Sequence, residues 1–211
     1  MSYAVKTVYY TLQGEGAHTG RPAVLLRFAG CNLWSGREHE RATAICQFCD
    51  TDFVGTDGPG GGSYATPEDL ASVVAAQWPK SVPRQRYVVC TGGEPLLQLD
   101  PPLIDQLHTR GFELAIESNG TIAVPSGIDW VCVSPKAGAP LVQKSGDELK
   151  LVYPQDGAEP EQYERFDFRY LYLQPMDGPN LIRNTELAVR YCMEHPQWRL
   201  SLQMHKLLGI R

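Results

Sequence analysis

The chain has 211 residues, of which 43% are hydrophobic and 20% charged, a balance typical of a globular protein rather than of a disordered or fibrous one. Its formal net charge of −5 comes without any run of lysine or arginine, which disfavours direct binding to DNA or RNA. A chain of this length fits one domain, which we expect over residues 1–211. Neither a basic N-terminal patch with an apolar stretch nor a long apolar run is present, so we expect a location in the cytoplasm without membrane contact.

Strand patterns and helical patterns follow one another along the chain. Thr66-Pro67 with two acids behind it predicts the start of a helix, and further helices are predicted at about 96–110 and 180–195. The glycine-rich segment 55–63 predicts a loop. This order implies a mostly parallel sheet, and the helices are too few for eight complete βα units, so we expect an α/β fold with an incomplete, modified (β/α) barrel. Strands are predicted at 23–28, 87–90, 112–117, 130–134, 149–153, 170–174 and 199–204.

Polar residues follow six of the predicted strands. In parallel α/β folds, ligands bind outside the carboxyl ends of the strands, so these positions are the first candidates for a site. Any one of the groups is compatible with ordinary turn chemistry, but six of them at one rim indicate a binding site. The six groups are 30–32, 91–95, 117–120, 134–136, 174–177 and 204–206.

The six cysteines are too sparse for the disulfide framework of a small secreted protein. Cys90, Cys132 and Cys192 stand in apolar contexts, and each is predicted to pack as a small hydrophobic side chain.

The other three cysteines form the sharpest pattern in the sequence. Fourteen residues separate Cys31 from Cys46, and two separate Cys46 from Cys49. Three thiolates suit three corners of a [4Fe-4S] cubane and leave one iron open to a further ligand. His39 lies in the same segment and would complete a Cys3His zinc site, so the spacing alone leaves zinc as an alternative. The Thr-Gly-Gly-Glu-Pro segment 91–95 favours the open iron, because two glycines let the backbone approach a ligand closely.

The motifs, taken together and in order, closely resemble those of the 7-carboxy-7-deazaguanine synthases, which are radical S-adenosylmethionine (SAM) enzymes of queuosine and 7-deazapurine biosynthesis. The resemblance runs from Gln13 to the last residues, and its long first cysteine gap departs from the common C-x3-C-x2-C spacing. It implies a single radical SAM domain and a carbon–nitrogen lyase that converts 6-carboxy-5,6,7,8-tetrahydropterin to 7-carboxy-7-deazaguanine with loss of ammonia. The motifs are LQGEG at 12–16, GCNL at 30–33, CQFCDT at 46–51, TGGEP at 91–95, SPK at 134–136 and QMHK at 203–206.

The resemblance also implies how the cofactors are held. Cys31, Cys46 and Cys49 would bind the [4Fe-4S] cluster, and SAM would bind at its open iron and yield the radical, so no side chain is expected to be the catalytic group. Thr51 is implied as a ligand of Mg²⁺, although by itself it would be taken as a turn residue. The implied SAM-binding residues are Gly93, Ser134, Pro135, Lys136, Gln174, Pro175, Met176 and Asp177, with Glu117 and Asn119 as plausible additions.

A carboxylated pterin needs a cation and groups that read the edge of its ring. Arg27 can give a bidentate pair to the carboxylate, or else form a surface ion pair. The run 12–14 (Leu12, Gln13 and Gly14) can read the pterin edge, or else be a glycine-rich turn, and Thr91 would face the substrate. The terminal carboxylate of Arg211 is implied to enter the site, although chain termini are usually frayed.

The expected partners are the pterin, a one-electron donor such as flavodoxin and a second copy of the chain in a homodimer. Two other classes remain open: another radical SAM enzyme, such as a glycyl-radical activase, and a zinc-stabilised binding module.

Overall fold

A mostly parallel sheet of nine strands forms the body of the protein in the computed structural model, which describes residues 2–82 and 84–210. The strand order within these residues is β3-β1-β2-β4-β5-β6-β7-β8-β9. Each adjacent pair of strands between β2 and β9 is parallel. β1 pairs antiparallel with both β2 and β3. The bounds are β1 Tyr3–Leu12, β2 Pro22–Phe28, β3 Gly62–Tyr64, β4 Arg86–Gly92, β5 Phe112–Ser118, β6 Trp130–Val133, β7 Ser145–Tyr153, β8 Asp167–Pro175 and β9 Trp198–Leu200.

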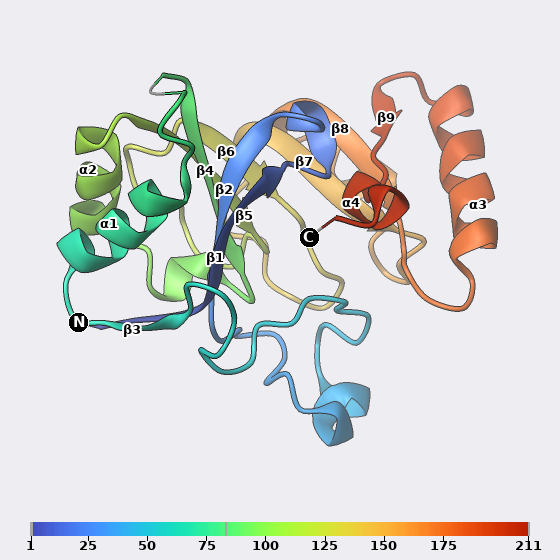
Figure 1. Cartoon of the computed structure of the whole chain (residues 1–211). Helices are drawn as coiled ribbons and strands as arrows, with labels where there is room; N and C mark the ends of the chain where they lie inside the picture. The colour runs from blue at the N-terminus through green and yellow to red at the C-terminus, as the bar shows by residue number, and fades with distance from the viewer. Residues whose placement is uncertain (1, 83, 211) are drawn as a thin grey trace.

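The sheet curves but does not close, because β3 and β9 are its two edges and do not pair with each other. The expected incomplete barrel with mostly parallel strands is therefore confirmed. Figure 1 shows the curved fan of strands, with the segment between β2 and β3 below them.

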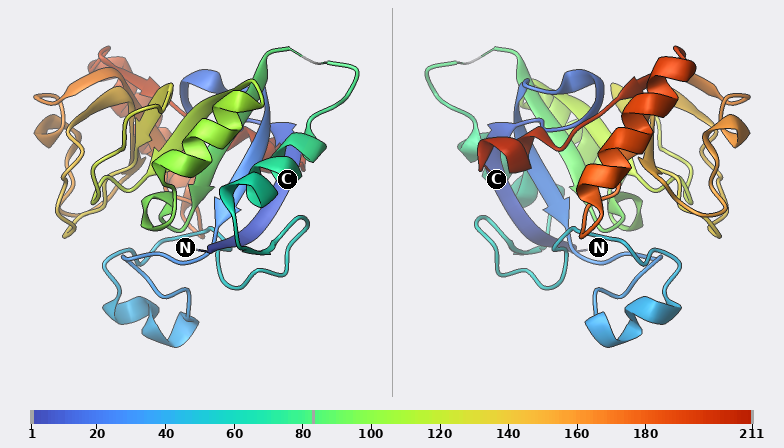
Figure 2. Two further views of the ribbon diagram at one scale, coloured as in Figure 1. Left: turned by 90° about the vertical axis from the view of Figure 1, so that its left-hand side faces the viewer. Right: turned by 90° about the vertical axis from the view of Figure 1, so that its right-hand side faces the viewer.

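Three of the four α-helices cover the outer face of the sheet at its two ends. Helices α1 (Pro67–Gln77) and α2 (Pro101–Thr109) pack together beside β1 and β5, while α3 (Leu181–Glu194) packs on β8 and β9. The two views of Figure 2 show α1 and α2 on one side of the molecule and α3 on the other. A short further helix, α4 (Met204–Leu208), begins against the loop after β1, where Met204 N donates to Gly14 O at 2.9 Å. None of the helices in the described part of the chain could cross a membrane.

The strands have an apolar outer face and an inner face that mixes apolar with polar side chains. Along β2, Leu26 and Phe28 are fully buried in the core beneath α1 and α2, whereas Leu25 and Arg27 line the inner hollow. Successive side chains of a strand point to opposite faces, so this alternation follows from the sequence directly. The helices thus stabilise the fold from outside and leave the inner face to the site.

The predicted helix starts were accurate where a cap is present. Thr66 accepts a hydrogen bond from Asp69 N at 3.2 Å, and α1 begins at the next residue, as predicted. The helix predicted at 96–110 is wrong at its start: a 3₁₀ turn covers Pro95–Leu97, and α2 begins after Asp100, whose carboxylate accepts from Leu103 N at 3.1 Å.

Three strand predictions also differ from the structure. β1 was not predicted, because Lys6, Thr7 and Tyr9 on its inner face break the apolar pattern. The strand predicted at 199–204 ends at residue 200, and α4 follows. The loop predicted at 55–63 ends in the short β3, which uses two of its residues.

Candidate active site

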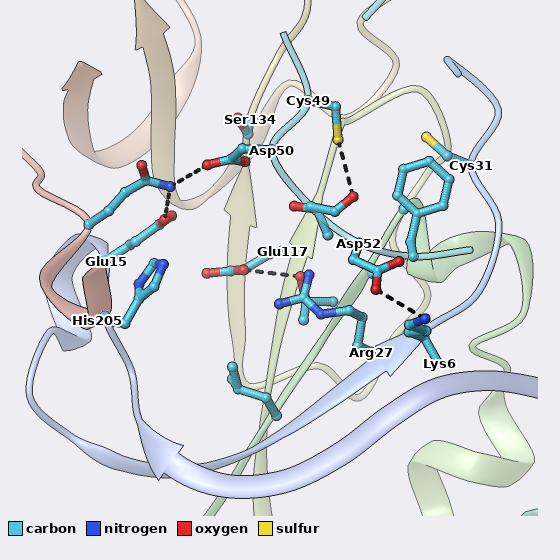
Figure 3. Close-up of a pocket in the computed structure, with 18 of the residues that line it drawn as sticks. Lys6, Glu15, Arg27, Cys31, Cys49, Asp50, Asp52, Glu117, Ser134 and His205 are labelled. Atoms are coloured by element: carbon cyan, nitrogen blue, oxygen red, sulfur yellow. Dashed lines mark hydrogen bonds and ion pairs between the residues drawn. The ribbon is translucent and has the colours of Figure 1, made fainter. Parts of the chain in front are cut away.

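A cavity of about 630 Å³ opens on the inner face at the carboxyl ends of the strands. All six polar groups singled out from the sequence contribute to its wall, so the predicted rim is confirmed. Figure 3 shows Cys31 and Cys49 on one side of this cavity and Glu15 and His205 on the opposite side, with Arg27 and Glu117 between them.

The cysteine side is built by the long connection after β2. Cys31, Cys46 and Cys49 are free thiols that all line the cavity, although fourteen residues separate the first two. Leu33 N lies 3.4 Å from Cys31 Sγ, and Cys46 N donates to Leu33 O at 3.3 Å, so the backbone near Cys31 also positions Cys46. Three unpaired thiols that face one cavity fit a cluster that needs three protein ligands.

The segment between Cys31 and Cys46 carries a 3₁₀ helix at Glu38–Thr43. Its Arg41 donates to the carbonyls of Gln47 at 3.0 Å and Cys49 at 3.1 Å, and its guanidinium lies 3.9 Å from the ring centre of Trp34. The insertion is therefore tied to the cysteine turn by one cation, which explains how a long gap still yields a compact triad.

The electrostatics of the triad are uneven. Burial raises the pKa of the Cys31 thiol. A hydrogen bond from Cys46 lowers the pKa of Cys49, and the same contact raises the pKa of Cys46. The nearby ammonium of Lys136 favours the thiolate at both of these cysteines, which is the form that binds iron.

The zinc alternative fails on geometry. The side chain of His39 is 76% exposed and contacts Glu40 instead of the cysteines. Within residues 2–82 and 84–210, no group of three His, Cys, Asp or Glu side chains is arranged to hold a single metal ion. A cubane gives each thiolate its own iron, so it accepts sulfur atoms that are further apart than a tetrahedral zinc site allows.

Gly93 lies where the glycine loop passes the first cysteine. A Cβ at this position would be 2.2 Å from Gly30 O and 2.6 Å from Cys31 Cβ, so no other residue fits without moving the cysteine. The next residue, Glu94, is fully buried and accepts from Ser118 Oγ at 2.9 Å and from Asn119 N at 2.8 Å. Glu94 thus holds the ends of β4 and β5 together beside the triad.

Six of the eight residues predicted for SAM line the same cavity as the triad, whereas Pro135 and Met176 do not. Lys136 Nζ donates to Ser134 O at 2.6 Å and to Ser134 Oγ at 2.8 Å, so this loop holds its own shape. Pro135 is buried and does not line the cavity, and the backbone of Met176 is bound to Tyr153 O at 2.8 Å and to Asn184 Nδ2 at 2.9 Å. Those that line the cavity are Gly93, Ser134, Lys136, Gln174, Pro175 and Asp177.

The residues predicted for the substrate line the same cavity, as far as the structure describes them. Leu12, Gln13, Gly14, Arg27 and Thr91 all contribute to the wall, as does Thr51. Arg211 lies outside the described residues.

Arg27 is the free cation of this group. It stands beside Thr91 in the parallel register of β2 and β4 and beside Thr7 in the antiparallel register of β1 and β2. Its guanidinium has no hydrogen-bond or ion-pair partner in the part of the chain that the structure describes. An unpaired guanidinium in a cavity is suited to an anionic ligand group.

Sequence reasoning missed Lys150, whose side chain is only 5% exposed. Its Nζ contacts Glu15 Oε2 and lies 3.3 Å from Glu117 Oε1. A signal was present: Glu148 and Lys150 alternate with leucines along β7, which places two charged side chains on the inner face.

The segment around α4 closes the cavity. Met204 N donates to Gly14 O at 2.9 Å, and a Cβ on Gly14 would lie 2.4 Å from His205 Nδ1. Lys206 Nζ lies 2.6 Å from both Asp50 Oδ2 and Asp177 Oδ2. One lysine therefore joins the cysteine loop to the loop after β8.

Comparisons with known proteins agree with this geometry. The chain is 63% identical over 210 residues to 7-carboxy-7-deazaguanine synthase of Caulobacter vibrioides and 64% identical over 211 residues to that of Bradyrhizobium diazoefficiens, with 100% of both chains covered in each case. The crystal structure of QueE from Escherichia coli superposes with a TM-score of 0.71 at 29% identity and covers 97% of this chain and 95% of that one. No family model matches.

Proposed function

Since this chain belongs to the 7-carboxy-7-deazaguanine synthase family, we propose that its cavity converts 6-carboxy-5,6,7,8-tetrahydropterin to 7-carboxy-7-deazaguanine with loss of ammonia, in queuosine or 7-deazapurine biosynthesis. The observation that carries the proposal is that three free cysteines and an unpaired arginine face one cavity. In a radical SAM enzyme the cofactor and the substrate bind in one cavity. The cysteines would hold the cofactor there, and the arginine would hold the substrate carboxylate.

The cofactor residues follow from this proposal. Cys31, Cys46 and Cys49 would hold the [4Fe-4S] cluster, which together with SAM would supply the radical chemistry of the reaction. The residues assigned to SAM are Gly93, Ser134, Pro135, Lys136, Gln174, Pro175, Met176 and Asp177, with Pro135 and Met176 acting through the shape of their loops.

The substrate residues bind and orient. Arg27 pairs with the pterin carboxylate, while Gln13 and Thr91 are held by Glu117 at 3.1 Å each and face the ring. Thr51, which lines the cavity, would supply a hydroxyl to Mg²⁺, an ion that usually binds through few protein groups and keeps several waters.

A one-electron donor such as flavodoxin, a homodimer and a cytoplasmic location complete the proposal. All six cysteines are free thiols, which suits a reducing compartment. Sedimentation of the purified protein tests the dimer, and reduction of the cluster by flavodoxin tests the donor.

Anaerobic purification with iron and sulfide analysis, followed by an assay with the carboxypterin, tests the function. We expect a filled cluster and formation of 7-carboxy-7-deazaguanine. Cys49→Ala should lose both, whereas Cys192→Ala should keep both, because Cys192 belongs to α3 and packs on the outer core away from the cavity. A filled cluster without pterin turnover would favour a different radical SAM activity, such as a glycyl-radical activase.

A further inference from the structure

Lys150 is a largely buried cation in the floor of the cavity, on the inner face of β7. Its neighbours along the strand, Leu149 and Leu151, are fully buried in the outer core with α3. The lysine contacts Glu15, from the loop after β1, and lies 3.3 Å from Glu117 of β5. Three distant parts of the chain therefore meet at one ammonium group.

Stability alone does not account for this arrangement. Replacing buried ion pairs by apolar residues of similar volume is often neutral or stabilising, since desolvation offsets the attraction between the charges. Both carboxylates line the cavity, and neither is shielded from it. The feature to be explained is a pair of adjacent carboxylates that share one cation.

Each carboxylate is oriented by additional donors. Gln203 Nε2 donates to Glu15 Oε1 at 3.0 Å, while Thr91 Oγ1 and Gln13 Nε2 each donate to Glu117 at 3.1 Å. A carboxylate oxygen has two lone pairs, so acceptor capacity remains on the side of the cavity.

The charges around the pair favour its ionised form. Burial would raise the pKa of Glu117, but the charge and hydrogen bond of Lys150, with those of Thr91 and Gln13, outweigh burial and lower it. Burial would likewise lower the pKa of Lys150, and the surrounding anions raise it well above its usual value. The titratable groups acting on Lys150 are Glu15, Glu117, Cys132 of β6, Glu148 of β7 and Lys136 after β6.

A third carboxyl group near Lys150, that of Glu148, has hydrogen-bond partners of its own. Burial raises the pKa of Glu148, which accepts from Cys132 Sγ at 3.2 Å and from Ala17 N at 2.8 Å. Glu148 thereby fixes the loop that carries Glu15. Cys132 is thus more than the small hydrophobic side chain that the sequence indicates.

We propose that Lys150 is a positioning residue that keeps Glu15 and Glu117 ionised side by side, so that both accept hydrogen bonds from the amino and ring N–H groups of the pterin. The inference rests on the proposed function. It adds Lys150 as the cation that stabilises two neighbouring carboxylates. A 2-amino-pyrimidinone edge is rich in donors, and two carboxylates match it.

The test compares Lys150→Met with Lys150→Arg and with Lys80→Met, a matched control at an exposed lysine without a hydrogen-bond or ion-pair partner among residues 2–82 and 84–210. Each is purified anaerobically as holoenzyme, and kcat and KM for the carboxypterin are measured across the neutral pH range. Without the ammonium, one carboxylate of the pair takes up a proton.

We expect Lys150→Met to lower kcat/KM by about 10- to 100-fold at neutral pH, mainly through KM, in the range found for outer-shell partners of other sites. Activity should recover as the pH rises, because the extra proton is then lost. Lys150→Arg should keep the pH profile of the wild type. The double variant Lys150→Met/Glu15→Gln should also regain that profile, though not full affinity, because one carboxylate no longer needs a countercharge.

A KM and pH profile of Lys150→Met equal to those of Lys80→Met would overturn the inference while leaving the proposed function intact. Absence of turnover in the wild type would instead overturn the proposed function. If Lys150→Met does not fold, the double variant decides: a profile like the wild type supports the inference, and an activity that still needs high pH overturns it.

Discussion

Replacing Arg27 by methionine removes the unpaired cation of the cavity and keeps much of its apolar stem. A bidentate guanidinium–carboxylate pair contains two charged hydrogen bonds, and loss of one partner of such a pair costs about 2–5 kcal/mol. At about 1.4 kcal/mol per factor of ten, kcat/KM should fall roughly 30- to 3,000-fold. Arg27→Lys should lose less, because it keeps the charge without the paired donors.

Folding should be nearly unaffected. The guanidinium has no partner in the described part of the chain, so its removal leaves no carboxylate unpaired and should change the free energy of unfolding by less than about 0.5 kcal/mol. Thermal unfolding and iron content therefore control for structure.

The assay measures kcat/KM for the carboxypterin and binding of a tetrahydropterin that lacks the carboxylate. The variant should bind this analogue as the wild type does, because the missing contact belongs to the carboxylate. An unchanged kcat/KM for the carboxypterin, or an equal loss of binding for both compounds, would refute the assignment of Arg27.

Three further outcomes are expected. Thr51→Ala should abolish the stimulation of turnover by Mg²⁺, and an unchanged metal dependence would reject Thr51 as a ligand. Gly93→Ala should lower iron content, measured after anaerobic reconstitution, because its Cβ would displace Cys31; full iron content would contradict the close packing. The hydrogen bond from Arg21 lowers the pKa of Glu113, so this carboxylate stabilises the fold above its unfolded pKa of about 4.3, and the contribution is lost as the pH falls through the lowered value. Glu113→Gln should therefore lower Tm by about 1–3 °C at neutral pH and have no effect in acid, since a half-exposed pair contributes at most about 1 kcal/mol.

The sequence predicted the rim of the site better than its floor. Residues after parallel strands converge on one edge whatever the packing, so the groups at 91–95, 134–136 and 174–177 could be placed from topology alone. Which residues form the floor depends on which strands lie opposite each other across the cavity. The contact between Lys150 and Glu15 depends on the tertiary fold, because the two residues are 135 positions apart in the sequence.

The errors in the elements have a similar origin. Asp100 and Pro101 are a strong start signal that outweighs the apolar residues before them, and the prediction followed the apolar residues. β1 was missed because its inner face is made polar by the cavity it serves. Prediction from sequence patterns relies on apolar residues at inward-facing positions. In a barrel that binds a polar ligand, some inward-facing positions are polar, so the pattern fails there.

The placement of charge in the cavity separates two tasks. Cysteine thiolates need nearby positive charge, which Lys136 supplies on the rim, whereas the donors of a pterin need negative charge, which Glu15 and Glu117 supply on the floor. Without Lys150 the two carboxylates would repel each other, and they would also repel the substrate carboxylate that we propose Arg27 binds. A buried lysine at the centre of the floor lets a cavity bind an anionic group and a donor-rich edge of the same small molecule.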